Sequence, residues 1–401
     1  MWTAAFVAFF SLLTAEAATA AIVRWMRQGC QWIITPSDLC PDIDHEGLKR
    51  FLAHGWDAEL GWVRIPNTAH DETGEGGRLT CYHVGSDGAR RNPGFENSPP
   101  LALAFGDSYT FARQVNDDET WAHHLSVILG GNVANYGVGN YGIDQALLRL
   151  EREFDDHPAS VVLMGVVPES ICRVMSVWKH YIEYGNTLGF KPRFILEGED
   201  LKLLSNPVDT PDKFFGISDL LPQLKKNDVF FERKFSRDLI RFPYVWHLAR
   251  SWSRNGPLLA AAFWDRMSGG GKRAFMRVMA RNITMTAEFY CEPGPMDLLV
   301  AICRRFAAFT RAKNATPVIL ILPQLYDLKQ IRGGNHYYMP LMERLADEGI
   351  PAVDFAPSLL SVDNDESLYI DDRFGGHFSL FGNRFLAEQI AKRLREIKPD
   401  L

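Results

Sequence analysis

The stretch PLALAFGDSYTF, residues 100–111, decides the fold. Residues 100–105 are all apolar, and Gly106 ends the run two positions before Ser108. A short apolar run of this kind is typical of a strand buried on both faces of a parallel sheet. Ligand-binding and catalytic groups in open α/β sheets gather at the carboxyl ends of such strands. Because Gly106 permits a tight turn, we expect Ser108 to face a cleft.

The same pattern continues on both sides of a long interruption. Further apolar, strand-like runs cover 132–137, 160–167, 316–323 and 350–355. Helical patterns cover 118–129, 143–154, 297–312, 340–349 and 378–397. Strands that alternate with helices form a parallel sheet with helices on both faces. The sequence therefore predicts a flavodoxin-like three-layer α/β/α sandwich over residues 99–400, with about five strands.

Three segments lie outside this alternation. Residues 1–28 form a hydrophobic N-terminal helix, residues 29–98 an irregular segment with short strands, and residues 171–295 an insertion too long for a plain connection. We expect the insertion to form a cap region. Its aromatic residues favour core packing, with a platform for sugar rings as the alternative; they are Trp178, Tyr181, Trp246 and Trp252.

The N-terminal helix is the candidate targeting element. Residues 2–23 carry one charge, Glu16, and about 20 apolar residues suffice to span a bilayer. A carboxylate near the centre of a span is costly, and a signal peptide would begin with basic residues that are missing here. We expect membrane association through residues 2–23, or export. A buried or interfacial helix of a cytoplasmic protein is the alternative.

Composition excludes some functions. The formal net charge of −6 argues against a surface devoted to nucleic acid. None of the six cysteines forms a C-x-x-C motif, and no cysteine–histidine spacing is typical of zinc. We therefore expect neither a metal nor an organic cofactor.

Ser108 needs a base, because a free hydroxyl is a poor nucleophile at neutral pH. The segment YIDDRFGGHFSLFGN places His377 just before the last helix, after Asp371 and Asp372. The final loop of such a sheet can return to the end of its first strand. His377 would then meet Ser108, with an acid orienting the imidazole.

Three motifs, GDSYTF, NYGVGNYGIDQ and GGHFSLFGN, together resemble the SGNH/GDSL hydrolase superfamily. The nearest type is membrane-linked and occurs with bacterial surface-polysaccharide genes. The resemblance implies that Ser108 is the nucleophile and His377 the base. It also implies that Ser108 and the Gly139–Asn140 pair supply backbone donors to an oxyanion hole. The implied substrate is a small ester or an acylated, for example acetylated, glycan.

The chain departs from the family pattern at three places. The second-motif glycine corresponds to Asn140 or to Gly139, and a backbone donor survives in either case. The acid usually stands two or three residues before the histidine, where Gly375 and Phe374 lie here; Asp372 is assigned, with Asp371 as the alternative. The asparagine of the third motif is replaced by Glu169 or Ser170, and of these only serine can donate. Losing an oxyanion donor costs about 10²–10³ in rate. A weak or inactive SGNH-like module, or an O-acyltransferase partner in polysaccharide modification, is therefore an alternative.

The letters GVGNYG, residues 137–142, also match the dinucleotide-binding pattern G-x-G-x-x-G. That fingerprint normally follows the first strand of its unit, with an acid about 20 residues further on. Here a strand with its own Gly-Asp-Ser turn comes first, although Glu169 does follow the next strand. A Rossmann-like nucleotide-binding protein is thus the second alternative, and serine esterase chemistry is favoured.

Overall fold

The computed structural model describes residues 2–370 and 376–401, and the chain divides into two compact units. The helical unit comprises Met1–Leu52, Met175–Lys191 and Asn206–Met285. The sheet unit comprises Ala53–Val174, Pro192–Ser205 and Thr286–Leu401. The segment 29–98 and the insertion 171–295 each contribute residues to both units.

A five-stranded parallel sheet forms the centre of the sheet unit. Its strands are β5 (Pro100–Phe105), β6 (Asn132–Asn135), β7 (Val161–Val166), β10 (Thr316–Ile321) and β11 (Ala352–Asp354). Read from one edge they lie in the order β6-β5-β7-β10-β11. Numbered along the chain, this order is 2-1-3-4-5, which is the flavodoxin-like arrangement. The predicted fold class is confirmed.

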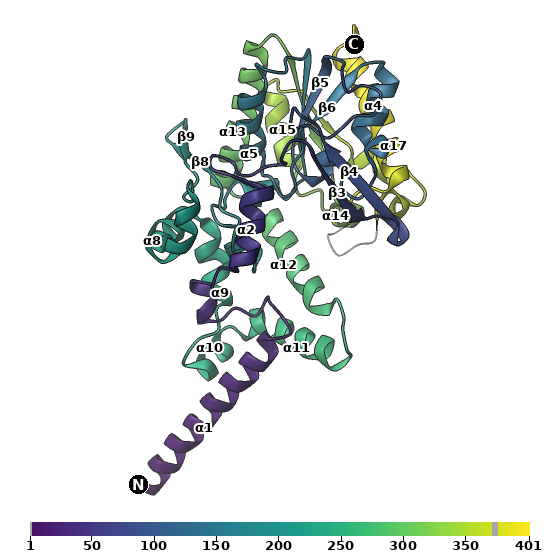
Figure 1. Cartoon of the computed structure of the whole chain (residues 1–401). Coiled ribbons are helices and arrows are strands. Elements are labelled where there is room, and N and C mark those ends of the chain that lie inside the picture. Colours follow the sequence, from purple (N-terminus) through teal and green to yellow (C-terminus); the bar gives the residue numbers. More distant parts are fainter. Residues whose placement is uncertain (1, 371–375) are drawn as a thin grey trace. The chain divides into compact units, whose positions relative to one another are not determined.

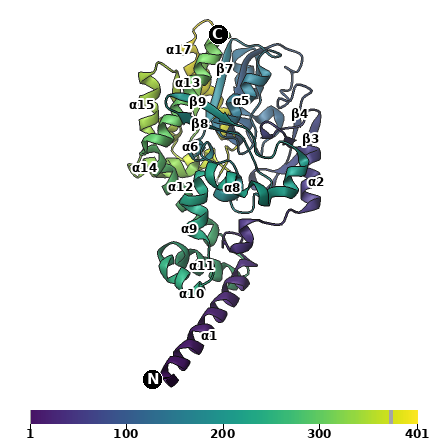
Figure 2. The same ribbon diagram turned by 90° about the vertical axis from the view of Figure 1, so that its left-hand side faces the viewer.

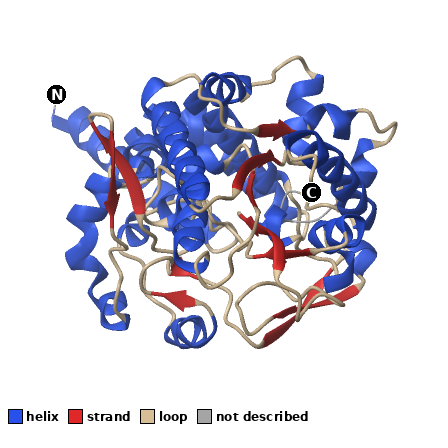
Figure 3. Cartoon of the chain, turned by 90° about the horizontal axis from the view of Figure 1, so that it is seen from above, coloured by secondary structure: helices blue, strands red, loops and turns tan. Residues whose placement is uncertain are grey.

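Both faces of the sheet are covered because alternate side chains of each strand point to opposite faces. Ala102 and Ala104 pack with α4 (Trp121–Leu129) and α17 (Leu380–Ile397) in one apolar cluster. On the other face, α5 (Ile143–Glu153) packs on β5 and β7, and α13 (Pro293–Ala312) on β10. Figure 3 shows these strands, in red, between blue helices.

Local sequence explains where the covering helices begin and end. The side chain of Thr120 accepts a hydrogen bond from the N–H of His123 and so caps the start of α4, which ends at Gly130 in the left-handed conformation. Ser379 caps α17 in the same way through the N–H of Gly382. The helix after the histidine motif therefore starts at a fixed residue, Leu380, three positions beyond His377.

Small antiparallel pairs extend the sheet unit (Figure 1). They are β1 (Trp56–Asp57) with β2 (Gly61–Trp62), β3 (Thr68–Thr73) with β4 (Leu79–Val84), and β8 (Arg193–Glu197) with β9 (Asp200–Leu204). The pair β8–β9 is the hairpin within the predicted insertion.

The helical unit is built around a second apolar cluster. It includes α1 (Trp2–Arg27), α10 (Tyr244–Arg250), α11 (Trp252–Met267) and the first part of α12 (Arg273–Tyr290). Val23 and Met26 of α1 pack with Leu258 and Ala262 of α11 and Val278 of α12. Figure 2 shows α1 extending beyond α10 and α11. The helix α1 is long and apolar enough to cross a membrane.

Candidate active site

Ser108 is the first residue of the short helix α3 (Ser108–Phe111), directly after β5. Asp107 caps this helix by accepting the N–H of Tyr109 at 2.9 Å. Gly106 has φ +151°, and a Cβ there would lie 2.1 Å from Oγ1 of Thr110 and 2.5 Å from the carbonyl oxygen of Gly165. The sharp turn therefore requires glycine, and it places Ser108 at the carboxyl edge of the sheet.

The predicted base lies against the predicted nucleophile. Nε2 of His377 is 2.9 Å from Oγ of Ser108, and both residues are buried although they are 269 positions apart. This distance lies within hydrogen-bond reach for an alcohol and an imidazole. The structure thus brings together the two side chains that the sequence singled out, and their chemical roles remain a prediction.

Main-chain hydrogen bonds on both sides fix the position of His377. Its carbonyl oxygen accepts the N–H of Ile370 at 2.7 Å, and the N–H of Ser379 donates to Leu368 at 2.8 Å. Tyr109, next to Ser108, packs its ring against the imidazole with centroids 4.8 Å apart. Its hydroxyl donates to the carbonyl oxygen of Gly376 at 2.8 Å. The turn at Ser108 and the segment at His377 are therefore connected by direct contacts.

The orienting acid assigned to Asp372, with Asp371 as the alternative, lies outside the residues that the structure describes. That part of the predicted site stays a prediction.

The glycine-rich segment after β6 runs beside the turn at Gly106–Ser108. The N–H of Val138 donates to the carbonyl oxygen of Gly106 at 3.0 Å. A Cβ on Gly137 would lie 2.4 Å from the main-chain nitrogen of Phe111, so only glycine permits this approach. Asn135 reinforces it, because its amide donates to the carbonyl oxygen of Thr110 at 2.7 Å and its oxygen accepts the N–H of Gly137 at 3.0 Å.

Gly139 and Asn140 form the turn that follows. Nε1 of Trp62 donates to the carbonyl oxygen of Gly139 at 2.9 Å, which fixes the plane of the Gly139–Asn140 peptide. Because N–H and C=O point in opposite directions across a trans peptide, the N–H of Asn140 points away from Trp62. Asn140 itself is exposed and has φ +66°, a conformation that asparagine tolerates. The hydrogen bond to Gly139 therefore fixes the direction of the Asn140 backbone N–H and does not fix the Asn140 side chain.

The position of the third motif holds an ion-pair network. Glu169 precedes α6 (Ser170–Arg173) and accepts Nη2 of Arg173 at 2.8 Å. Nη1 of the same arginine donates to Asp107 at 2.6 Å and to the carbonyl oxygen of Tyr141 at 3.1 Å. Glu169 therefore acts as the partner of a cation, and Ser170 is buried at the first position of α6.

Sequence reasoning missed two arginines that hold the site. Arg173 stands four residues after Glu169, the spacing of an ion pair along a helix, which is the one local signal for it. Arg90 is buried and donates to the carbonyl oxygens of Phe111 at 2.9 Å, Ala112 at 2.7 Å and Val115 at 2.5 Å. It thereby satisfies the end of α3 and the loop beyond it, as buried carbonyl groups require.

Further along the same sheet edge lies a buried carboxyl group. Asp327 is in α14 (Leu325–Arg332), shortly after β10, and accepts the hydroxyl of Tyr337 at 2.5 Å and the N–H of Gln324 at 2.7 Å. Burial raises the pKa of Asp327 to about 7; the negative charges of Glu169 and Asp354 add to the rise, and the two hydrogen bonds oppose it.

No family model and no curated protein matches the chain. The chain is similar to solved structures of G-D-S-L-type lipolytic enzymes. One is a lipolytic protein of the G-D-S-L family from Desulfitobacterium hafniense DCB-2, 11% identical over 73% of this chain and 97% of that chain, with a TM-score of 0.32.

Two other similar structures are esterases. The psychrotrophic esterase EstA from Pseudoalteromonas sp. is 9% identical over 75% of this chain and 98% of that chain, with a TM-score of 0.33. The acetyl xylan esterase AlAXEase is 13% identical over 73% of this chain and 98% of that chain, with the same TM-score. Likenesses this distant carry no weight for the site, whose interpretation rests on the contacts above.

The nucleotide-binding alternative is disfavoured by the topology. GVGNYG follows β6, an edge strand and the second along the chain, whereas a Rossmann fingerprint follows the first strand of its unit. Its first glycine is explained by the close approach of Gly137 to Phe111. Glu169, the acid that would hold a ribose, is paired with Arg173.

Proposed function

We propose that this protein is a serine esterase or acyl hydrolase of the SGNH type, with Ser108 as nucleophile and His377 as general base. The observation that carries the proposal is the 2.9 Å separation of Ser108 Oγ and His377 Nε2 at the carboxyl edge of the sheet. The tight turn at Gly106 and the Asp107 cap support it, because they present the hydroxyl at the start of a short helix.

The reaction begins when the Ser108 oxygen bonds to the ester carbonyl carbon and its proton passes to Nε2 of His377. The carbonyl oxygen becomes an oxyanion, for which the N–H groups of Ser108 and Asn140 are the candidate donors. The carbon–oxygen bond to the leaving alcohol then breaks, and the imidazolium returns its proton to that alcohol. Water then gives a proton to His377 as its oxygen bonds to the acyl carbon. The bond from that carbon to the Ser108 oxygen breaks, the imidazolium returns its proton to Ser108, and the acid is released.

The acyl group should be small. Only 8% of the Ser108 surface is exposed, so a short chain such as acetyl reaches it more readily than a long one. The resemblance of the motifs to the SGNH superfamily favours O-acetyl groups of a glycan as the substrate class. If a sugar hydroxyl replaces water in the second step, the same residues catalyse acyl transfer.

The test compares hydrolysis of p-nitrophenyl acetate by the full chain with that by Ser108→Ala, His377→Gln and the control Ser98→Ala, which changes an exposed serine of the same unit. We expect at least a thousandfold loss in the first two variants and an unchanged rate in the control. A fluorophosphonate should label the wild type and not Ser108→Ala. Equal rates for wild type and Ser108→Ala would leave only a binding role. A p-nitrophenyl octanoate rate above the acetate rate would contradict the small acyl group.

A further inference from the structure

The N-terminal half of α1 is exposed on every side. Residues 2–15 are all exposed and carry no charged side chain. At about 1.5 Å per residue they extend about 21 Å, whereas the hydrocarbon core of a bilayer is about 30 Å thick. This part of the helix can enter a bilayer, but it is too short to cross one. The helices that pack on the second half of α1 would then lie at the boundary between the hydrocarbon core and the lipid headgroups.

Glu16 marks the point where α1 meets the rest of the helical unit. Its carboxylate is buried and accepts the N–H groups of Tyr244 at 2.6 Å and Val245 at 3.0 Å, the first two residues of α10. The residue before them, Pro243, has no side-chain acceptor to offer. The one charge of residues 2–23 therefore satisfies the start of another helix, and it does not have to enter hydrocarbon unpaired.

Large aromatic side chains are exposed around this junction. Trp246 of α10 is 64% exposed, and Trp252 and Trp264 of α11 are each 62% exposed. Phe263 of α11 contacts Trp25 of α1, with ring centroids 6.3 Å apart. Exposed apolar surface of this extent marks an interaction site, and tryptophan is the residue enriched where membranes meet water.

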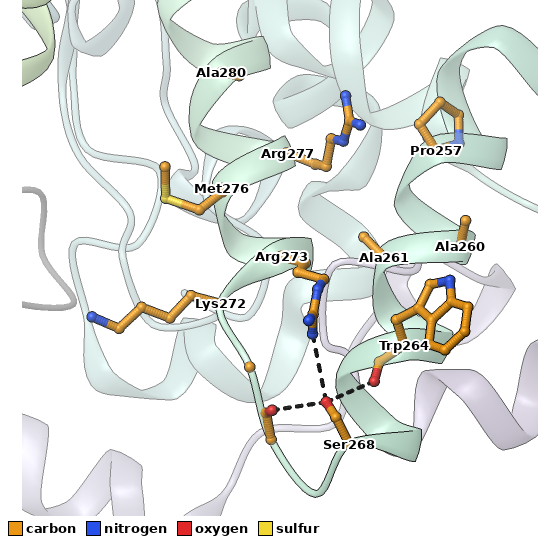
Figure 4. Close-up of a pocket in the computed structure, with 12 residues that line it drawn as sticks. Pro257, Ala260, Ala261, Trp264, Ser268, Lys272, Arg273, Met276, Arg277 and Ala280 are labelled. Carbon is orange, nitrogen blue, oxygen red and sulfur yellow. Dashed lines mark hydrogen bonds between the residues drawn. The ribbon is translucent and has the colours of Figure 1, made fainter.

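A groove between α11 and α12 adds positive charge to the same region (Figure 4). Its volume is about 960 Å³, and its apolar wall includes Ala260, Ala261, Trp264 and Met276. Lys272, Arg273 and Arg277 line it as well; Arg273 pairs with Asp265 at 3.3 Å. A groove with an apolar wall and the cations Lys272 and Arg277 suits a molecule that has an anionic head and an apolar tail.

We propose that this aromatic-basic face, formed by α1, α10, α11 and the start of α12, docks on an anionic lipid bilayer. Residues 2–15 enter the hydrocarbon. The tryptophans 246, 252 and 264 lie at the headgroups, and Lys272 and Arg277 bind lipid phosphate. Lipid is the occupant that fits this face, because the basic side chains complement lipid phosphate and the face continues into the apolar α1.

The depth of the three tryptophans in the bilayer is tested with the full chain and with vesicles of phosphatidylcholine and phosphatidylserine. The acyl chains of these lipids carry bromine, a short-range quencher of tryptophan emission. The variant Trp246→Phe/Trp252→Phe/Trp264→Phe should show clearly less quenching than the wild type. The control Trp178→Phe changes a buried tryptophan of the same unit that stacks on Phe190 and should leave the quenched signal unchanged. Equal quenching in the triple variant and the wild type would overturn the proposal.

The contribution of Lys272 and Arg277 to binding of anionic lipid is tested by co-sedimentation of the full chain with vesicles. Lys272→Gln/Arg277→Gln should bind phosphatidylserine vesicles about 20- to 30-fold more weakly, and phosphatidylcholine vesicles equally well, since each basic residue near an anionic surface contributes about fivefold. Lys225→Gln/Lys226→Gln, the same charge change on α8 (Ile217–Asn227) of this unit, is the control. A concentration-dependent dimer that covers the tryptophans, without bromine quenching, would assign the face to a second copy and refute docking on lipid. Hydrolysis of a soluble ester serves as a separate readout, which these variants should not change.

Discussion

Replacing Arg173 by methionine should loosen the turn that carries Ser108. The guanidinium donates to Asp107 at 2.6 Å, and the two side chains are 9% and 2% exposed. Methionine keeps much of the aliphatic volume but leaves the Asp107 carboxylate buried without its cation. Removing one partner of a buried ion pair costs about 3–5 kcal/mol. We expect the free energy of unfolding to fall by that amount.

The catalytic effect follows from position, because Arg173 does not touch the reacting atoms. Asp107 caps the first turn of α3 through Tyr109, so a displaced carboxylate shifts the helix that begins at Ser108. A misplacement of about 1 Å can cost about a hundredfold in rate. We expect kcat for p-nitrophenyl acetate to drop between tenfold and a hundredfold, with KM changed little.

A double-mutant cycle separates this effect from general damage. Asp107→Asn retains an oxygen that can accept the N–H of Tyr109, so Asp107→Asn/Arg173→Met should be more stable than Arg173→Met alone. The coupling should be about 2 kcal/mol or more, measured by urea unfolding. Arg152→Met, which breaks a more exposed pair with Asp57, should cost less than about 1 kcal/mol. Additive effects in the cycle, or wild-type kcat in Arg173→Met, would refute the reasoning.

Three further changes test the site and its surroundings. The pKa of Asp327 is raised to about 7, so the folded chain keeps a proton that the unfolded chain loses near pH 4. The free energy of unfolding should therefore fall by up to roughly 4 kcal/mol from pH 4 to 7 and level off above pH 7. Urea unfolding of Asp327→Asn should show no such decline. Gly106→Ala should lower the free energy of unfolding by roughly 2–5 kcal/mol, because the new Cβ is strained and overlaps its neighbours. Gly94→Ala is the control, since Gly94 also has a positive φ but open space around it, and it should cost about 1 kcal/mol. Similar melting temperatures for the two variants would contradict the predicted overlap. Tyr109→Phe removes the hydrogen bond to Gly376 and should cost about 1 kcal/mol and lower kcat severalfold; an unchanged pH-rate profile and kcat would show that this contact does not position the histidine.

The fold could be predicted because its strands are buried on both faces. Runs such as residues 100–105 and 161–167 lack polar residues, and helical patterns separate them, so a parallel sheet follows from the hydrophobic pattern alone. Ser108 and His377 were found by their place after a strand and before the last helix. Their contact depends on topology, since β5 lies inside the sheet and the segment before α17 returns to its carboxyl edge.

The contacts that hold the site could not be predicted in the same way. Arg173 and Asp107 are 66 positions apart, and Arg90 reaches carbonyl groups 21 to 25 positions away. Such pairs form no periodic pattern, because each depends on one long side chain reaching one buried partner. Glu16 shows the same limit. From sequence it counted only as a cost of membrane insertion, and its partners at the start of α10 lie 228 and 229 positions further on.

The replacement of the third-motif asparagine acquires a physical interpretation from these contacts. Glu169 accepts hydrogen bonds from Arg173, so it cannot donate to an oxyanion, and the arginine that holds it also holds the cap of the nucleophile turn. If the chain is the proposed esterase, Glu169 at this position fixes the turn through Arg173 and does not contact the substrate. In the proposed esterase, the candidate oxyanion donors that remain are main-chain N–H groups, which a rigid turn would keep in place, and the hydroxyl of Ser170. A site with fewer donors can remain effective when the remaining ones need no reorganisation during the reaction.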